Sequence, residues 1–432
     1  MRKITFLLAL ALLLTIAGTA GAATTADELL SSVDEKDGML TRGEFAKMLV
    51  TAAGMKGDEP SVQILTEGGI LKGYPDGELH LEQGINRLEA VSLAARSLGL
   101  TDAIVPPPGV SAPLDKNHWG YNLYAWFTRQ GLVTDNPNEL LTEEQGAAFL
   151  QKVFTTDPEV VSILEASQAK TSIQNQSVQT VMSGSMKMIP RAGVETEGLP
   201  TSVINLEMVQ EMTLPDKLHQ TANMMVQAAG EEPTEMATEM YMVAGEVYQK
   251  MPDAEEGIAK WYRFPKDLLP DMEQVFKKAE QQSSVIPPEL EQFLHYQLLG
   301  TTELNGETVY EVAFYGRVDD FNKFMQAALG QFGDSQQLTQ SMSNAASVLK
   351  SMSYWGIEYL GTDDFLPRSA DYTALVTYQE QFNGQPMPLE ALQTYMKVEE
   401  YNYDADITIE LPEEAVNAPV LPISQNSLET VE

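Results

Sequence analysis

The sequence predicts a multidomain protein of α and α+β class. An all-α repeat unit comes first, and a curved antiparallel β-sheet covered by helices follows it. The chain has 432 residues, 43% of them apolar, which exceeds one ordinary domain and is enough to build real cores. A helix-capping motif recurs three times in the first third of the chain. From Val178 onward, apolar and polar residues alternate with a period of two, as in half-buried strands.

The first residues have the pattern of an export signal. Arg2 and Lys3 precede an apolar run from Ile4 to Ile16, and small residues follow at Ala20–Ala22. We interpret residues 1–23 as a cleaved signal peptide. A retained membrane anchor is the alternative, but the run is shorter than the ~20 residues that a bilayer span needs. We therefore expect an exported protein with no transmembrane segment after cleavage.

The net charge and the cysteine content limit the classes of partner and of covalent modification that the protein can have. With 27 basic and 62 acidic residues, the formal charge of −35 repels nucleic acid and anionic membrane surfaces. The sequence has no cysteine, which excludes disulfides, thiolate metal ligands and a lipid-modified cysteine. We expect export without a lipid tether.

Three short segments carry the repeat: Leu40–Glu44 (LTRGE), Ile85–Glu89 (INRLE) and Leu141–Gln145 (LTEEQ). Each places Thr or Asn three residues before Glu or Gln, which is the spacing of a capping box. The spacing of roughly fifty residues between copies suits a repeat of two helices and a loop. Gly54 and Gly99 follow the first two helices, where a left-handed residue ends a helix. We assign residues 24–154 to these repeats.

The stretch VDEKDGMLTRGEF, residues 33–45, has some likeness to a calcium-binding loop. With Gly38 at the sixth loop position, Glu35, Asp37 and Glu44 fall where an EF-hand has ligands. The first ligand position is Val33, which offers no oxygen. The sequence therefore favours a helix cap over a metal site here, and we expect no metal.

The segment Gly69–Leu100, GILKGYPDGELHLEQGINRLEAVSLAARSLGL, resembles an S-layer homology (SLH) repeat. His118 and Trp119, followed by a helix over Tyr121–Phe127, resemble the start of another, and the similarity extends over residues 38–154. The resemblance implies a pseudo-threefold helical bundle whose grooves bind pyruvylated secondary cell-wall polysaccharide at the cell surface. Carried over by position, the polysaccharide-binding residues are Arg42, Arg87, Gly73, Tyr74, Asp76, Gly77 and Trp119.

The third repeat departs from the pattern, with Glu143 in place of the arginine and Gln145 in place of the glutamate. We expect its groove not to bind. In the other two, the planar fork of arginine suits bidentate binding of a ketal carboxylate. The alternative is that Arg42 and Arg87 pair with neighbouring glutamates.

The second half of the chain predicts strands with inserted helices. Residues 155–175 read as a linker helix, and a hairpin is expected around a two-residue turn at Asn305–Gly306. Further strands are predicted at 178–188, 204–214, 218–226, 236–242, 247–250, 366–377, 397–406 and 407–412. Helices are predicted at 267–282, 288–293, 319–329 and 335–352.

Three stretches look like the lipoprotein-carrier (LolA/LppX-like) half-barrel superfamily: LLGTTELNGETVYEVAFYG, WGIEYLGTDDFLPRSADY and YNYDADITIELPEEAVNAP. The resemblance covers residues 172–418; we set the domain at 176–418 and a polar tail at 419–432. It implies that lipid or acyl chains are held between sheet and helices.

Methionines support a related hypothesis. Eleven of the 21 fall between Met182 and Met251, and adaptable thioethers line apolar pockets well. The candidate cavity residues are Met182, Met186, Met208, Met212, Met224, Met240 and Met242. Ordinary core packing beneath helices is the alternative.

Catalysis has little support in the sequence. The four histidines are scattered, and no nucleophile elbow, phosphate loop or dinucleotide fingerprint occurs. Acid pairs such as Asp319–Asp320 and Asp363–Asp364 suit turns or caps. We predict a non-enzymatic envelope protein without a cofactor, anchored to wall polysaccharide and presenting a ligand-binding or partner-binding domain. A purely structural S-layer-associated protein is the alternative.

Overall fold

A computed structural model gives the fold of most of the chain. The described residues are 24–33, 38–55, 57, 59–101, 104–107, 109–133, 136–174, 177–194, 203–213, 217–227, 232–252, 259–264, 293–319, 321, 347–382, 384–403 and 405–421. The predicted signal peptide lies outside them.

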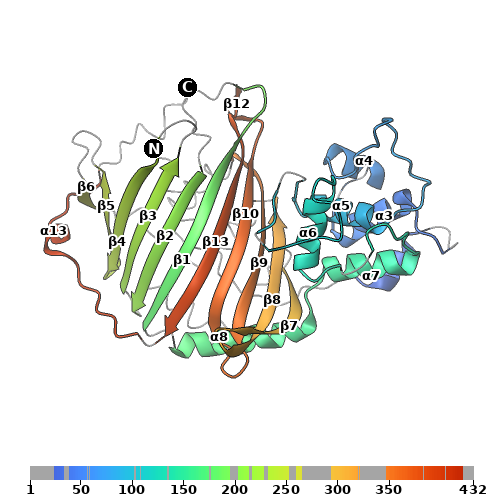
Figure 1. Ribbon diagram of the computed structural model, residues 1–432. Helices are drawn as coiled ribbons and strands as arrows, with labels where there is room; N and C mark the ends of the chain where they lie inside the picture. Colours follow the sequence, from blue (N-terminus) through green and yellow to red (C-terminus); the bar gives the residue numbers. More distant parts are fainter. Residues whose placement is uncertain are drawn as a thin grey trace.

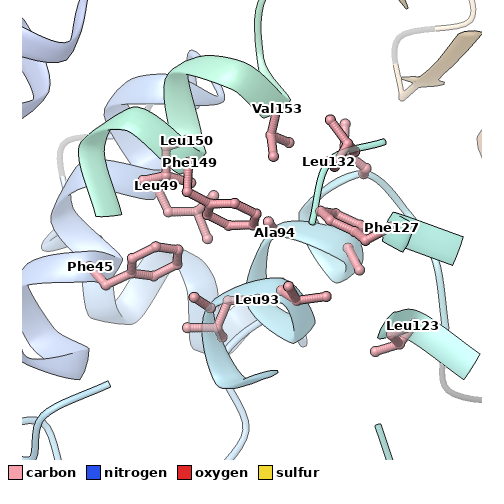
Figure 2. Packing of buried hydrophobic residues seen from close by; sticks show 14 of the residues in the cluster. Phe45, Leu49, Leu93, Ala94, Leu123, Phe127, Leu132, Phe149, Leu150 and Val153 are labelled. Atoms are coloured by element: carbon pink, nitrogen blue, oxygen red, sulfur yellow. The ribbon is translucent and has the colours of Figure 1, made fainter. Parts of the chain in front are cut away.

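In the part of residues 24–153 that the structure describes, the helices are α2 (Ala26–Ser31), α3 (Arg42–Ala52), α4 (Ser61–Glu67), α5 (Arg87–Ser97), α6 (Tyr121–Arg129) and α7 (Glu143–Val153), which we call the helical part. All three predicted capping boxes are present, at the N-termini of α3, α5 and α7. Gly54 and Gly99 have positive φ where α3 and α5 end, as the sequence predicts. Phenylalanines and leucines of α3, α5, α6 and α7 converge in one core (Figure 2).

The residues just before the three caps form a closed ring of backbone hydrogen bonds. The Leu40 amide donates to Leu141 (3.0 Å), Leu141 to Ile85 (3.0 Å) and Ile85 to Leu40 (2.8 Å). Each of the three capped helices packs on one further helix: α3 on α4, α5 on α6 and α7 on α2. The three sequence repeats are therefore related by cyclic contacts, and α2 closes the cycle.

In the described part of the second half, eleven strands form one antiparallel sheet in the order β6-β5-β4-β3-β2-β1-β13-β10-β9-β8-β7. Their bounds are β1 (Ser177–Pro190), β2 (Val203–Thr213), β3 (Lys217–Gln227), β4 (Thr234–Val243), β5 (Glu246–Pro252), β6 (Ala259–Arg263), β7 (His295–Leu304), β8 (Glu307–Val318), β9 (Leu349–Gly361), β10 (Pro367–Tyr378) and β13 (Leu389–Tyr403). A small ribbon pairs β11 (Gln381–Phe382) with β12 (Gln385–Pro386).

The sheet has two chemically different faces, because successive side chains of a strand point to opposite sides. We call the face that carries Met186, Met208 and Tyr354 the methionine face. The opposite one, which carries Tyr315 and Trp355, is the docking face. The pairing register of the strands assigns the other residues to a face, because two residues directly opposite each other on neighbouring strands point to the same side of the sheet.

The helical part packs on the docking face beside β7–β10 (Figure 1). The Trp355 ring, almost fully buried, lies 6.1 Å from Trp126, 5.7 Å from Phe127 and 5.1 Å from Tyr315. Arg129 of α6 forms an ion pair with Asp371 of β10. The helical part and the sheet thus share a continuous apolar core.

The predicted linker helix is α8 (Pro158–Gln174), and it does more than connect. Val160, Ile163 and Leu164 are buried against Tyr296 and other residues of β7–β10. Figure 1 shows α8 beneath the strands in that view. The helix is therefore part of the core of the sheet domain.

At the opposite end of the sheet, the segment after β13 crosses the docking face. Ile409 and Ala415, the latter in α13 (Glu413–Val416), are buried with Tyr241, Tyr248 and Trp261. The expected strand at 407–412 is wrong: these residues pair with no strand, because their side chains serve as a cover and the Ile409 carbonyl accepts from the Lys217 ammonium.

The hairpin prediction is confirmed. β7 and β8 flank Asn305 and Gly306, both with positive φ, which matches a two-residue turn. The predicted helices at 267–282, 288–293 and 319–329 lie almost entirely outside the described residues. The prediction for 335–352 is wrong at its end, because Leu349–Met352 belong to β9, which is paired on both sides by β8 and β10. Among described helices, none has the length and apolarity to cross a membrane.

Candidate functional site

The strand register places all seven candidate methionines on one face. Met182 lies opposite Met208 on the neighbouring strand. Met212 lies opposite Leu218, which in turn lies opposite Met242. The remaining members, Met186, Met224 and Met240, occupy positions of the same parity on β1, β3 and β4. With Ile204, Leu206 and Met396, they form a broad apolar surface.

A polar row crosses this apolar surface. Tyr401 of β13 lies opposite Thr180, which lies opposite Gln210, which in turn lies opposite Gln220. The side-chain carbonyl oxygens of Gln210 and Gln220 are buried and have no hydrogen-bond partner among the described residues. Buried acceptors without partners cost about 1–3 kcal/mol each, so this row is not explained by packing alone.

Glu358 of β9 is a further polar residue on the same face. It lies opposite Ala370 of β10, which lies opposite Val398 of β13, and Val398 lies opposite Met182. Desolvation raises the pKa of Glu358 to about 7. Its charge in turn raises the pKa of Tyr401 and Tyr403, which burial already raises. Glu358 is not fully closed off from solvent, and its carboxylate forms no ion pair with any described residue. We call Glu358, Tyr401, Thr180, Gln210 and Gln220 the polar band.

A recess of about 240 Å³ adjoins one end of this band, since Tyr401 is among its lining residues. Arg368, Glu307, Glu399 and Glu400 also line it. Arg368 is already paired, at 2.6 Å to Glu307 and 2.8 Å to Asp364. Glu399 is paired as well, with Lys397, so Glu400 is the lining carboxylate that has no ion pair with a described residue.

In the helical part, Arg42 is committed to internal partners. Its guanidinium donates to the carbonyls of Leu79 (3.1 Å) and Lys72 (3.3 Å) and lies 3.3 Å from the Glu89 carboxylate. It also stacks over the Tyr74 ring at 4.7 Å. The side chain is 5% exposed. Arg42 thus ties the glycine-rich loop to α5 rather than presenting a free fork.

The other predicted loop residues gather beside Arg42. The Tyr74 hydroxyl donates to Glu89, and burial together with that carboxylate raises the pKa of Tyr74 to about 12. Asp76 accepts from the Glu78 amide and contacts His80. Gly77 has a φ of 86°, and a Cβ on Gly73 would lie 3.2 Å from the Gly77 carbonyl oxygen, so both positions favour glycine.

Arg87 lies at the second inter-repeat contact and pairs with Glu139 at 2.7 Å, which lowers the pKa of that carboxyl. Its side chain is partly accessible, and Nε has no partner. Trp119 is 53% exposed and packs beside His118. Glu143, at the equivalent position of the third repeat, is buried with one unpartnered carboxylate oxygen.

The stretch with likeness to a calcium loop contains a cap. The Glu44 carboxylate accepts from the Thr41 amide at 2.8 Å, and Val33 is buried in the core. Glu35 and Asp37 lie outside the described residues.

The sequence interpretation missed Glu358, Gln210, Gln220 and the partner carboxylates Glu89 and Glu139. For Gln210 and Gln220, the signal was present in strand parity, because both fall in phase with the apolar residues of the predicted strands at 204–214 and 218–226. No strand was predicted around Glu358, so its face could not be read from the sequence. The pairing of Arg42 with Glu89 joins different repeats and leaves no local trace.

Residues 159–420 match the model of a family of unknown function, DUF6612. The chain belongs to this family. Its match begins at α8, in agreement with the packing of that helix on the sheet. No curated protein matches the sequence.

Solved structures give weak likenesses to the DUF6612 region. LprF from Mycobacterium bovis is 14% identical, with a TM-score of 0.31, covering 60% of this chain and 98% of that one. Lipoprotein LppX from Mycobacterium tuberculosis is 9% identical, with a TM-score of 0.27, covering 59% and 100%. A DUF1329 protein from Desulfovibrio piger is 11% identical, with a TM-score of 0.22, covering 59% and 96%. Likeness at this level says nothing about function.

Proposed function

We propose that this protein is an exported envelope protein whose methionine face binds the apolar part of a ligand. The observation that carries the proposal is the register, which brings seven methionines from four strands to one face. Methionine side chains adapt to apolar ligands of varied shape. The proposal gives the protein no catalytic role.

Mass spectrometry of the protein purified without detergent tests this proposal directly. We expect a co-purifying amphiphile and binding of an apolar dye that the amphiphile displaces. Met208→Gln, a buried change on the methionine face, should weaken dye binding, whereas Met39→Gln, at an exposed residue of the helical part, should not. Absence of both lipid and dye binding would leave the structural alternative, in which the sheet domain is only a spacer.

We further propose that the helical part consists of SLH repeats that hold the protein on pyruvylated cell-wall polysaccharide. The closed ring of hydrogen bonds among Leu40, Ile85 and Leu141 supports a three-repeat arrangement. Because Arg42 is buried among internal partners, Arg87 and Trp119 carry this proposal.

Sedimentation with purified cell wall tests the anchor. We expect Arg87→Ala to reduce the bound fraction about tenfold, the effect of losing about 1.4 kcal/mol. Arg263→Ala, which removes a half-buried arginine of β6 that likewise pairs with a glutamate, is the matched control and should bind normally. Removing the whole helical part is a poor test, because it would uncover Trp355. Unchanged binding by Arg87→Ala and Trp119→Ala would refute the anchoring proposal.

A further inference from the structure

The methionine face combines an apolar surface with hydrogen-bond acceptors that have no partner in the described part of the chain. Gln210 and Gln220 each have a buried, unpartnered carbonyl oxygen, and they lie opposite one another on adjacent strands. Thr180 and Tyr401 continue the same row across β1 and β13. Acceptors spaced over neighbouring strands match a ligand that offers several donors, because strands lie about 4.8 Å apart.

Charge argues against an anionic ligand group. At the positions of this face, strands β1–β4, β8 and β13 carry no lysine or arginine. The recess at Tyr401 adds the carboxylate of Glu400 and that of Glu399, which pairs with Lys397, and its arginine, Arg368, is held by Glu307 and Asp364. A phosphate or carboxylate placed here would find no free cation among the described residues of these strands and would meet repulsion.

The polar groups also argue against a purely hydrocarbon ligand. An alkyl chain lying across Gln210, Gln220 and Glu358 would offer their oxygens no hydrogen-bond donor. Hydroxyl groups would satisfy these acceptors, and a tyrosine such as Tyr401 can both donate and accept. The adjoining methionines would cover the hydrocarbon part of the same molecule.

We infer that the polar band binds the head group of an amphiphile, and that this head group is uncharged and rich in hydroxyls, as in a glycosylated lipid. The inference rests on the proposed function and adds the class of ligand. Glu358 and Gln210 are the specificity-determining residues. Glu358 faces the same side of the sheet as Tyr401, two strands from β13 across Ala370, and Gln210 lies between Thr180 and Gln220 in the row.

Three detergents with the same dodecyl chain test the inference, each used below its critical micelle concentration in competition with an apolar dye. Dodecyl maltoside supplies hydroxyls, dodecyl sulfate a negative charge, and dodecyltrimethylammonium a positive charge without donors. We expect dodecyl maltoside to bind at least about tenfold more tightly than either charged detergent, since two or three added hydrogen bonds suffice for that ratio.

Two variants locate the preference. Glu358→Leu and Gln210→Leu should each cut the ratio of maltoside affinity to dye affinity about threefold to tenfold. Glu207→Leu, on an exposed position of β2 that points to the other side of the sheet, is the matched control and should keep the full preference.

The outcomes separate the two proposals. If no detergent or dye binds, the proposed function fails. If all three detergents bind alike, or if the cationic one binds best, the apolar site stands and the hydroxyl-rich head group is refuted. If the preference for maltoside persists in both leucine variants, the polar band is not its source and the inference is overturned.

Discussion

The two faces of the sheet are built from the same strands but serve different purposes. On the docking face, Tyr315 donates to the Val153 carbonyl at 2.9 Å, and Gln297 donates to the carbonyls of Lys152 and Thr155. On the methionine face, Gln210 and Gln220 keep carbonyl oxygens without partners. Both faces keep buried polar atoms without described partners, among them Ser353 Oγ and Trp355 Nε1 on the docking face, so the difference lies in what covers each face. The helical part covers the docking face at β7–β10, whereas the apolar cluster around Met208 contains, among the described residues, side chains of the sheet only.

The comparison is sharpest on β9, where neighbouring residues serve opposite faces. Trp355 is buried among aromatic rings of the helical part, while Glu358, three positions later, lies with tyrosines on the methionine face. Substitutions on the docking face should therefore cost stability, and substitutions in the polar band should change ligand binding or pH dependence.

The largest effect is expected from Trp355→Ala. Removal of a fully buried ring that contacts Trp126, Phe127 and Tyr315 should lower the free energy of unfolding by about 3–5 kcal/mol. Urea unfolding followed by tryptophan fluorescence measures it. Trp119→Ala, at a 53% exposed residue, is the control and should change stability by less than about 0.5 kcal/mol. Equal losses in both variants would contradict the docking role.

The next effect is expected at the ion pair between Arg129 and Asp371, whose side chains are 9% and 13% exposed. Removing one partner strands a desolvated charge, so Arg129→Met should cost about 3 kcal/mol. The double variant Arg129→Met with Asp371→Leu should regain most of the loss. A thermodynamic cycle from urea unfolding of the four proteins checks this, and strictly additive losses would show that the pair does not interact.

The sequence alone predicts those features whose causes are local. Capping boxes involve residues three positions apart, so Thr41 with Glu44 and Asn86 with Glu89 could be read directly. The turn at Asn305–Gly306 and the shared face of the methionines follow from turn chemistry and from a period of two.

The remaining features depend on contacts between residues far apart in the sequence and could not be predicted from local patterns. Trp126 meets Trp355 across the two halves of the chain, and nothing near either residue indicates the other. Likewise, the helix expected at 335–352 ends in β9 because pairing with β8 and β10 overrides local preference. The unpartnered state of Gln210 also depends on neighbours that only the fold supplies.

A smaller effect, dependent on pH, is expected on the methionine face. The pKa of Glu358 is raised by burial to about 7, so the folded protein binds this proton more tightly than the unfolded chain does. The carboxyl therefore destabilises the fold progressively as pH rises from about 4.5 through 7. Glu358→Gln should gain about 2 kcal/mol at pH 8 and nothing at pH 4, as measured by urea unfolding. The same gain at both pH values would mean that ionisation is not the cause.

The smallest effect is expected when the same substitution, glutamine to leucine, is made on each of the two faces. Gln220→Leu removes an unpartnered acceptor from the methionine face, so stability should change by less than about 0.5 kcal/mol or rise slightly. Gln297→Leu on the docking face removes a buried donor from two carbonyls and should cost about 2 kcal/mol. Unfolding curves of the two variants measure the contrast. If Gln220→Leu proved as costly as Gln297→Leu, the methionine face would be an ordinary closed core, because only a satisfied amide loses that much on replacement.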